Sequence, residues 1–235
     1  MTKLSIADLE DELKTVRERK DIIEELRILR CLGSAFQKNR QFTKSASCLS
    51  RALNLVQEKG SAEDRAFVHV HLGCVYWEMA QLKKSMTHFQ SALEIQELFH
   101  NLPVRANIMA LMGISCWRKC QWEEGLSYFY KVHDLCQTHT SIIAKTPEDG
   151  EYFFLAEALE RGVSTLQNRI RLGREQRNPL KILQPLFAMV PLYLFTQRKN
   201  GIEPLLREAA LLADQLRKKD IQSAIPKLQA LIVKW

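Results

Sequence analysis

Residues 69–76, His-Val-His-Leu-Gly-Cys-Val-Tyr, contain a large apolar residue followed by glycine, and this pair recurs 40 residues earlier and 40 residues later. The equivalent segments are residues 29–36, Leu-Arg-Cys-Leu-Gly-Ser-Ala-Phe, and residues 109–116, Met-Ala-Leu-Met-Gly-Ile-Ser-Cys. Further columns keep the same offset: Gln41, Gln81 and Gln121; Ser45, Ser85 and Gly125; Leu49, Phe89 and Phe129; Ala52, Ala92 and Val132. Self-similarity at a fixed period of this length indicates a repeat architecture.

Each repeat has the spacing of two amphipathic helices. Leu29, Leu32 and Phe36 lie at i, i+3 and i+7, on one face of a helix, and residues 45–55 repeat that spacing for a second helix. Helix breaks are expected near residues 39–40, 79–80 and 119–120, where the absence of proline implies short turns. A single helical hairpin cannot bury its apolar face, whereas stacked copies can. The sequence therefore predicts an all-α solenoid of antiparallel helix pairs.

The pattern resembles the tetratricopeptide repeat family, whose signature is a large residue, Leu-Gly, an aromatic residue, and then Ala, Phe and Ala. The clearest unit consists of His69, Leu72, Gly73, Tyr76, Ser85, Phe89 and Ala92. The period of 40 exceeds the usual period of about 34 and is similar to the extended-helix variant of kinesin light chains, cell-polarity scaffolds and some bacterial regulatory solenoids. The resemblance implies a right-handed superhelix whose concave groove, lined by the first helix of each unit, binds partners.

The chain is predicted to have three regions. Residues 1–20 form an N-terminal capping helix with Ser5 as its N-cap, residues 21–137 form three clear repeats, and residues 138–235 form degenerate, basic repeat-like helices. Residues 146–149, Thr-Pro-Glu-Asp, predict a helix start, after which residues 147–177 form either one helix or a pair split at Gly162. Residues 180–198 and 202–219 are predicted to form a hairpin, and residues 221–234 a last helix bent at Pro226.

Helix geometry selects candidate groove residues on the first helix of each repeat, on the side that points away from the second helix. They are Arg27, Arg30, Ser34, Lys38, Phe67, Val70, His71, Cys74, Trp77, Asn107, Ala110, Ile114, Trp117 and Arg118. This composition suits an extended or helical partner segment that is acidic and has apolar anchors. Trp77 and Trp117 are the first residues to test, and the alternative is that they pack between adjacent repeats. The clamp by which one subtype of the family binds chaperone tails is not present.

The positive charge of the chain is concentrated in its last third. The formal net charge is +7, but residues 1–160 hold 20 Lys/Arg against 22 Asp/Glu, and residues 161–235 hold 14 against 5. The densest basic cluster, Arg169, Arg171, Arg174, Arg177 and Lys181, is predicted to be a docking surface for phosphates or an acidic partner. Its alternative is a solvated helix face. Aromatic residues do not alternate with these arginines, which disfavours nucleic-acid binding without excluding it.

Several classes of function find no support in the sequence. Phosphate-binding loops, dinucleotide fingerprints, nucleophile elbows and zinc-protease motifs are absent, so we expect no enzyme and no cofactor. Cys116 and Cys120 could ligate zinc with His133 or His139, but structural zinc sites favour tighter cysteine spacing, so no metal is expected. The six scattered cysteines, the lack of a signal peptide at the start, and the short apolar run 182–195 predict a soluble intracellular protein, cytoplasmic or nuclear.

These features together predict a non-catalytic scaffold or adaptor that takes part in complex assembly. A partner peptide or helix would bind in the concave groove, and the basic C-terminal third would provide an additional docking surface. One alternative is a regulatory solenoid that contacts nucleic acid or a nucleoprotein complex through this basic third. Another is a self-associating oligomerisation module, if residues 183–195 expose an apolar stripe to a second copy.

Overall fold

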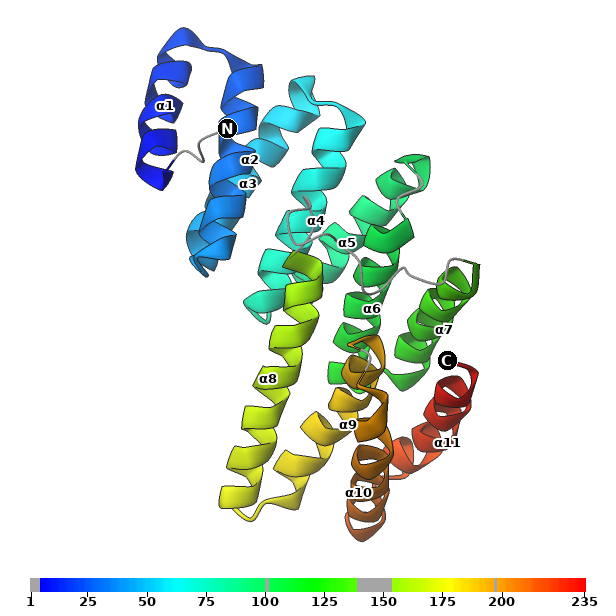
Figure 1. Ribbon diagram of the computed structural model, residues 1–235. Coiled ribbons are helices and arrows are strands. Elements are labelled where there is room, and N and C mark those ends of the chain that lie inside the picture. The colour runs from blue at the N-terminus through cyan, green and yellow to red at the C-terminus, as the bar shows by residue number, and fades with distance from the viewer. Residues whose placement is uncertain (1–4, 100–101, 139–153, 197) are drawn as a thin grey trace. The chain divides into compact units, whose positions relative to one another are not determined.

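The computed structural model describes residues 5–99, 102–138, 154–196 and 198–235 of the chain (Figure 1). Within these ranges the regular structure is helical and no strand occurs, which confirms the all-α prediction. The first helices are α1 (Ile6–Arg19), α2 (Ile22–Lys38), α3 (Phe42–Lys59), α4 (Ala62–Glu78) and α5 (Leu82–Phe99). They are followed by α6 (Leu102–Arg118), α7 (Trp122–Thr138), α8 (Phe154–Glu175), α9 (Pro179–Phe195), the 3₁₀ helix η1 (Lys199–Gly201), α10 (Ile202–Gln215) and α11 (Lys219–Lys234).

The helices group into two compact units, residues 1–101 and residues 102–235. The first unit contains α1 and the first two repeats, and the second contains the third repeat and the C-terminal helices. The division therefore falls after the second repeat and not at the change from clear to degenerate repeats near residue 137. Within the second unit, α6 packs against α8 and α9, and α7 packs against α11. The third repeat therefore shares its apolar core with the degenerate helices.

The turns between paired helices repeat one backbone conformation. The residue in the left-handed region is Lys20 (φ 57°), Arg40 (57°), Ala80 (58°), Cys120 (61°), Arg177 (48°) or Arg217 (52°). In each of the three clear repeats the next amide donates to the carbonyl five residues earlier: Gln41 to Phe36 (2.8 Å), Gln81 to Tyr76 (2.9 Å) and Gln121 to Cys116 (2.9 Å). This bond satisfies one of the carbonyls that a helix end leaves without a partner. The breaks predicted near residues 39–40, 79–80 and 119–120 are confirmed.

The same turn joins α8 to α9 and α10 to α11, where Asn178 donates to Gly173 (3.0 Å) and Lys218 donates to Ala213 (2.8 Å). This bond alone does not assign the repeat pairs, since Asp21 also donates to Val16 (3.3 Å) between α1 and α2, and Arg198 donates to Tyr193 (2.8 Å) between α9 and α10. The hairpin predicted from residues 180–198 and 202–219 corresponds to α9 and α10, which pack on each other. The degenerate region thus keeps the repeat's turns after its sequence signature has disappeared.

Close approach of the paired helices is permitted by the glycine column. A Cβ atom on Gly33 would lie 2.6 Å from Leu49 Cδ2, and one on Gly73 would lie 2.6 Å from Phe89 Cε1. Contacts this short are not tolerated between carbon atoms, so glycine lets the large side chain of the second helix lie on the first helix. The small residue that faces Gly33 from α3 adds a hydrogen bond between the two helices: the Ser45 hydroxyl donates to the Gly33 carbonyl oxygen at 2.7 Å.

Other sequence predictions have mixed outcomes. Ser5 caps α1 as predicted: its hydroxyl accepts from the Asp8 amide, and the Asp8 carboxylate accepts from the Ser5 amide in return. Residues 154–175 form one helix that continues through Gly162. The helix start predicted at residues 146–149 lies outside the described residues.

The apolar run in α9 is buried and does not form an exposed stripe. Side chains from Leu183 to Phe195 are buried, except for exposed Gln184 and half-buried Tyr193. The structural basis predicted for self-association is therefore wrong, because α9 is the central helix of the second unit, covered by α6, α8 and α10. Among the described residues, no helix combines the length and the apolar character needed to cross a membrane.

Candidate partner-binding surfaces

The cationic residues predicted on α2 lie on one face of that helix. Arg27, Arg30, Ser34 and Lys38 are spaced by three or four residues, so that their side chains lie in a row. Arg27 and Lys38 are exposed, while Arg30 and Ser34 are half-buried. Arg27 forms ion pairs with Glu24 (2.6 Å) and Glu12 (3.1 Å), and its hydrogen bond to Glu24 raises the pKa of the guanidinium. We refer to these four residues as the α2 row.

Arg30 connects the α2 row to α4. Its guanidinium forms an ion pair with Asp64 and lies over the Phe67 ring, 4.0 Å from the ring centroid. Partial burial favours the neutral form of the Asp64 carboxyl, but hydrogen bonds from Ser61 and the charge of Arg30 outweigh it and lower the pKa. Phe67 in turn stacks on His71, with ring centroids 3.9 Å apart. Residues predicted in two different repeats are thus brought together as a cation–aromatic stack.

The other predicted groove residues of α4 and α6 are buried. Phe67 and Trp77 are each 4% exposed. The exposed fraction is zero for Val70, His71, Cys74, Asn107, Ala110 and Ile114. Buried polar atoms among them bond within the chain: His71 Nδ1 is 2.9 Å from Gln37 Oε1, and Asn107 Nδ2 donates to the Pro103 carbonyl at 3.0 Å. The part of the predicted set that solvent reaches here is therefore the α2 row together with half-buried Arg118.

Trp117 is a packing residue of the second unit. Its ring is 1% exposed and lies within 5.4 Å, centroid to centroid, of Trp122, Phe129 and Phe187. The indole Nε1–H donates to the Phe187 carbonyl oxygen at 3.1 Å. The sequence had left two roles open for Trp117, partner binding and packing between repeats. In the structure it packs inside the second unit. The sequence could not choose between them, because the acceptor lies 70 residues further along the chain, in α9.

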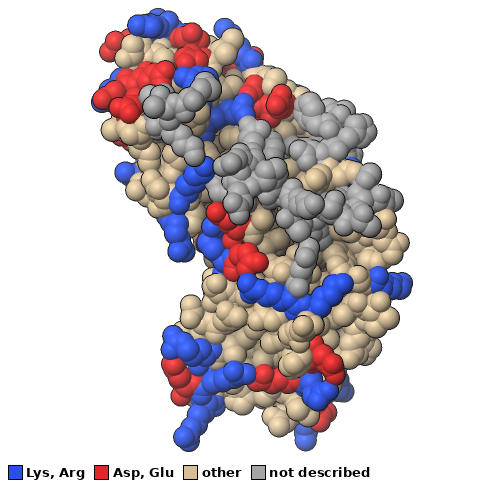
Figure 2. Space-filling model, in the orientation of Figure 1, with Lys and Arg blue, Asp and Glu red and all other residues tan. Residues whose placement is uncertain are grey.

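The basic cluster at the end of α8 is exposed but partly neutralised. Arg171 pairs with Glu175 (2.6 Å), and Arg174 contacts both carboxylate oxygens of Glu208 in α10 at 2.8 Å. Lys181 donates to the Gln176 side chain at 2.8 Å. In Figure 2, blue and red side chains accordingly lie side by side at this end of α8, α9 and α10. These contacts resemble a solvated helix surface, and a docking role for the cluster stays a prediction.

Arg169, also in this cluster, lies near the predicted groove residue Arg118. Burial lowers the pKa of Arg118, and the positive charge of Arg169 lowers it further. The structure thus brings one member of each predicted set together within the second unit, where α6 packs on α8. An acidic group placed near both arginines would be stabilised by their charge.

A histidine pair in the first unit was missed by the sequence analysis. His69 Nδ1 of α4 lies 3.1 Å from His88 Nδ1 of α5, and the His88 ring stacks on Tyr76 at 5.5 Å. Burial, together with the charges of His69 and Lys84, lowers the pKa of His88 to about 4. Burial and Arg65 also lower the pKa of His69, against the opposing effect of Glu94. His69 occupies the first column of the repeat and His88 precedes the Phe89 column, so the repeat alignment could have indicated their proximity.

The cysteines that had been considered for zinc binding lie in unlike environments. Cys116 is buried, and burial with the neighbouring charge of Glu124 raises the pKa of its thiol to about 12, whereas Cys120 is exposed. All six cysteines are free thiols. The described part of the chain holds no group of three or more His, Cys, Asp or Glu able to hold a metal ion; His139 lies outside it.

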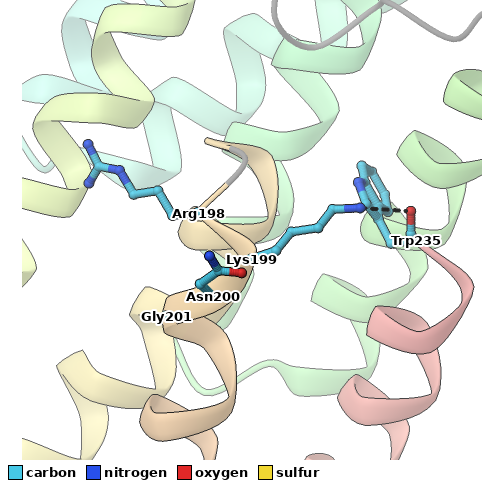
Figure 3. Close-up of a pocket in the computed structure, with 5 residues that line it drawn as sticks. All are labelled: Arg198, Lys199, Asn200, Gly201 and Trp235. Carbon is cyan, nitrogen blue, oxygen red and sulfur yellow. Dashed lines mark hydrogen bonds between the residues drawn. The ribbon is translucent and has the colours of Figure 1, made fainter.

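Two open cavities lie along η1 and α10. The first, of about 490 Å³, is lined by Arg198, Lys199, Asn200, Gly201 and Trp235 (Figure 3). The second, of about 430 Å³, is lined by Asn200, Glu203, Pro204, Arg207, Glu208 and Leu211. Asn200 belongs to both linings, so the two cavities are neighbours on one surface. No sequence pattern marks these residues, because their repeat is degenerate.

Helix pairs at a 40-residue period, closed by identical turns and packed through a glycine column, define an α-helical repeat protein. Residues 24–97 match the tetratricopeptide repeat family. This part of the chain is therefore a tetratricopeptide repeat region, and the resemblance seen in its columns is confirmed. Such repeats generally mediate protein–protein interactions and are typically non-catalytic.

Two solved structures are similar to the chain. BtubC (BKLC) from P. vanneervenii is 12% identical, with 96% of this chain and 89% of that chain covered and a TM-score of 0.47. A putative kinesin light chain from Podosopora anserina with nearly identical TPR-like repeats is 16% identical, with 82% of this chain and 97% of that chain covered and a TM-score of 0.43. No curated protein matches the chain.

Proposed function

We propose that the chain is a non-catalytic interaction scaffold, or adaptor, that binds an acidic segment of a partner protein along the α2 row. The observation that carries this proposal is the alignment of three cationic side chains, Arg27, Arg30 and Lys38, on the first helix of the first repeat. Carboxylates of an extended or helical partner could exchange with, or add to, the intramolecular pairs of these residues.

The stack of Arg30 on Phe67 holds one cationic side chain of this surface in a fixed position. A guanidinium held over an aromatic ring and paired with Asp64 loses less conformational freedom when a partner binds than a mobile arginine would. The basic residues of the second unit, Arg169 to Lys181, would add long-range attraction for the same acidic partner. That contribution would weaken with salt because exposed charges are screened.

The proposal is tested by comparing captured partners. An affinity-tagged Arg30→Glu/Lys38→Glu variant and the wild type are incubated with extract, and the bound proteins are quantified by mass spectrometry. A Lys59→Glu/Lys83→Glu variant, which reverses the same charge on the exposed second helices α3 and α5, is the matched control. We expect proteins bound by the wild type and the control to be depleted at least about tenfold with the α2-row variant. Equal recovery from all three chains would overturn the assignment to α2.

A further inference from the structure

The two neighbouring cavities along η1 and α10 have different chemistry. At one end Lys199 extends towards Trp235 and donates to its main-chain carbonyl oxygen at 3.3 Å, while Arg198 points the opposite way (Figure 3). Arg198 is held there by an ion pair with Glu160 (2.7 Å) and by the Tyr193 ring. Lys199 is therefore the cation that reaches into this cavity, beside the half-buried indole of Trp235.

The second cavity has two apolar residues, Leu211 and Pro204, in its lining, and its acidic groups are already paired. Leu211 is 62% exposed, one of few large apolar side chains so exposed among the described residues, and Pro204 lies beside the same cavity. Glu203 pairs with Arg207 and Glu208 pairs with Arg174, each at 2.8 Å, so neither carboxylate offers an uncompensated negative charge. The lining residues of the two cavities include three cations and two carboxylates, a net charge of +1.

We infer that this surface binds an extended segment of a second protein that carries an acidic side chain for Lys199 and an apolar side chain for Leu211. The choice of an acidic segment follows from charge complementarity at Lys199, and the apolar residue would cover Leu211 and Pro204. This inference rests on the proposed scaffold function and adds a binding surface in the second unit, separate from the α2 row.

The spacing of the two anchors sets the length of the motif. Lys199 and Leu211 are twelve positions apart along η1 and α10, which at a helical rise of about 1.5 Å per residue is about 18 Å. An extended peptide advances about 3.3 Å per residue, so the acidic and apolar residues of the ligand would be separated by about five positions. A helical ligand would need about twelve positions for the same span.

Fluorescein-labelled synthetic peptides test this spacing by fluorescence anisotropy with the full chain. The probe has two aspartates and two leucines separated by a four-residue Gly-Ser linker, and its controls replace aspartate by lysine, replace leucine by serine, or lengthen the linker to ten residues. We expect the probe to bind at least about tenfold more tightly than each control. Equal binding of the probe and its controls would overturn the inference.

Variants of the chain locate the bound peptide. Lys199→Glu and Leu211→Ser should each lower the affinity for the probe by about tenfold. Lys59→Glu and Ile23→Ser, which are matched changes of exposed residues in the first unit, should leave this affinity unchanged. Circular dichroism checks that each variant is folded. Unchanged binding by Lys199→Glu and Leu211→Ser would overturn the inference.

Two further outcomes separate this inference from the proposed function. If Arg30→Glu/Lys38→Glu abolishes probe binding and the second-unit variants do not, the peptide binds the α2 row, so the scaffold proposal stands and this surface is ruled out. If light scattering shows that the chain dimerises and that Leu211→Ser makes it monomeric, the surface is covered by a second copy, which also overturns the inference.

Discussion

The glycine column shows how single residues determine the spacing between the helices of a repeat. Cβ atoms placed on Gly33, Gly73 and Gly113 would lie 2.6 Å from atoms of Leu49, Phe89 and Phe129, respectively. The large residue of the second helix therefore occupies the volume that a side chain at the glycine position would need. The two columns are coupled, which is why they recur together at the 40-residue period.

A Gly73→Ala substitution should lower the stability of the first unit. Alanine favours the helix over glycine by about 1 kcal/mol, but the clash with the buried Phe89 ring costs about 1–3 kcal/mol, so we expect a net loss of about 1 kcal/mol. Urea denaturation followed by circular dichroism measures the change.

Phe89→Leu provides the control for this prediction. If the clash is the cause, the double variant should be more stable than the sum of the two single effects implies. Strictly additive effects, or an increase in stability with Gly73→Ala, would show that close approach is not the reason for glycine at this position.

Single residues could be predicted best where the three repeats provide equivalent positions that can be compared. The glycine, Ser45 and Phe89 columns were predicted correctly because each is represented three times. The burial of Trp117 and Phe67 could not be predicted, since it depends on helices whose position the local pattern does not specify. Trp117 packs under Phe187, 70 residues away, and Phe67 is covered by Arg30, a residue that the sequence placed on the partner-binding surface.

At the scale of helices, the repeated turn uses non-glycine residues in the left-handed region. This conformation costs residues with a side chain about 1–2 kcal/mol, whereas glycine adopts it readily. Ala80 is exposed and has φ of 58°, so Ala80→Gly should raise the stability of the first unit by up to about 1 kcal/mol. The urea midpoint provides the measurement. Ala62→Gly, in the first turn of α4, is the control and should have no stabilising effect; a lower midpoint for Ala80→Gly would contradict the role of the turn.

The histidine pair between α4 and α5 should make the first unit less stable in mild acid. One imidazole must accept the other's N–H, so at least one Nδ1 is unprotonated, and Arg65 and Lys84 further oppose protonation. The pKa of His88 in the folded chain, about 4, is below its ordinary value of 6.5. Its contribution to the free energy of unfolding is therefore complete above pH 6.5 and decreases as the pH falls from there towards 4.

Between pH 7.5 and pH 5.5 we expect the pair to account for a loss of about 1 kcal/mol, a figure that allows for its partial exposure. Urea denaturation at the two pH values measures the loss. His88→Asn removes the group with the larger shift, so the variant should lose less stability than the wild type over this interval. The same loss in both chains would mean that other groups determine the acid sensitivity.

In the C-terminal region, the apolar stripes alone do not determine which helices form a repeat pair. Residues 180–198 and 202–219 were predicted to form a hairpin, and they correspond to α9 and α10, which pack on each other. An apolar stripe on both sides of α9 fits either neighbour, because α9 is buried by α8 and α10 alike. The left-handed turns at Arg177 and Arg217 are themselves 40 residues apart, a regularity that the degenerate sequence does not reveal.

At the scale of the whole chain, the uneven charge yields a prediction about nucleic acids. Residues 161–235 carry a net charge of +9, but several of their arginines form ion pairs with glutamates. We therefore expect weak binding to a 20-base-pair duplex, with little difference between wild type and Arg171→Glu/Arg174→Glu at about 150 mM salt. Fluorescence anisotropy over a salt series measures this. Tight binding with a steep salt dependence that the variant loses would instead favour the nucleic-acid alternative.

The division of the chain into two units could not be read from the repeat. The sequence signature is continuous across residues 101 and 102, because the third repeat has the same columns as the first two. Its helices nevertheless share a core with the degenerate region through contacts such as Trp122 Nε1 with Asp220 (3.2 Å) and the Phe129 ring with Phe195. Repeat identity and packing unit are therefore different properties of this chain.

Hydrogen–deuterium exchange of the chain, measured with and without a captured partner, shows whether the partner binds along the α2 row. Binding there should slow exchange of amides in α2 and in the adjoining part of α4, and leave α3 unchanged. The effect should disappear in the Arg30→Glu/Lys38→Glu variant. Protection confined to α3 and α5, or equal protection in the variant, would show that the partner does not bind along the α2 row.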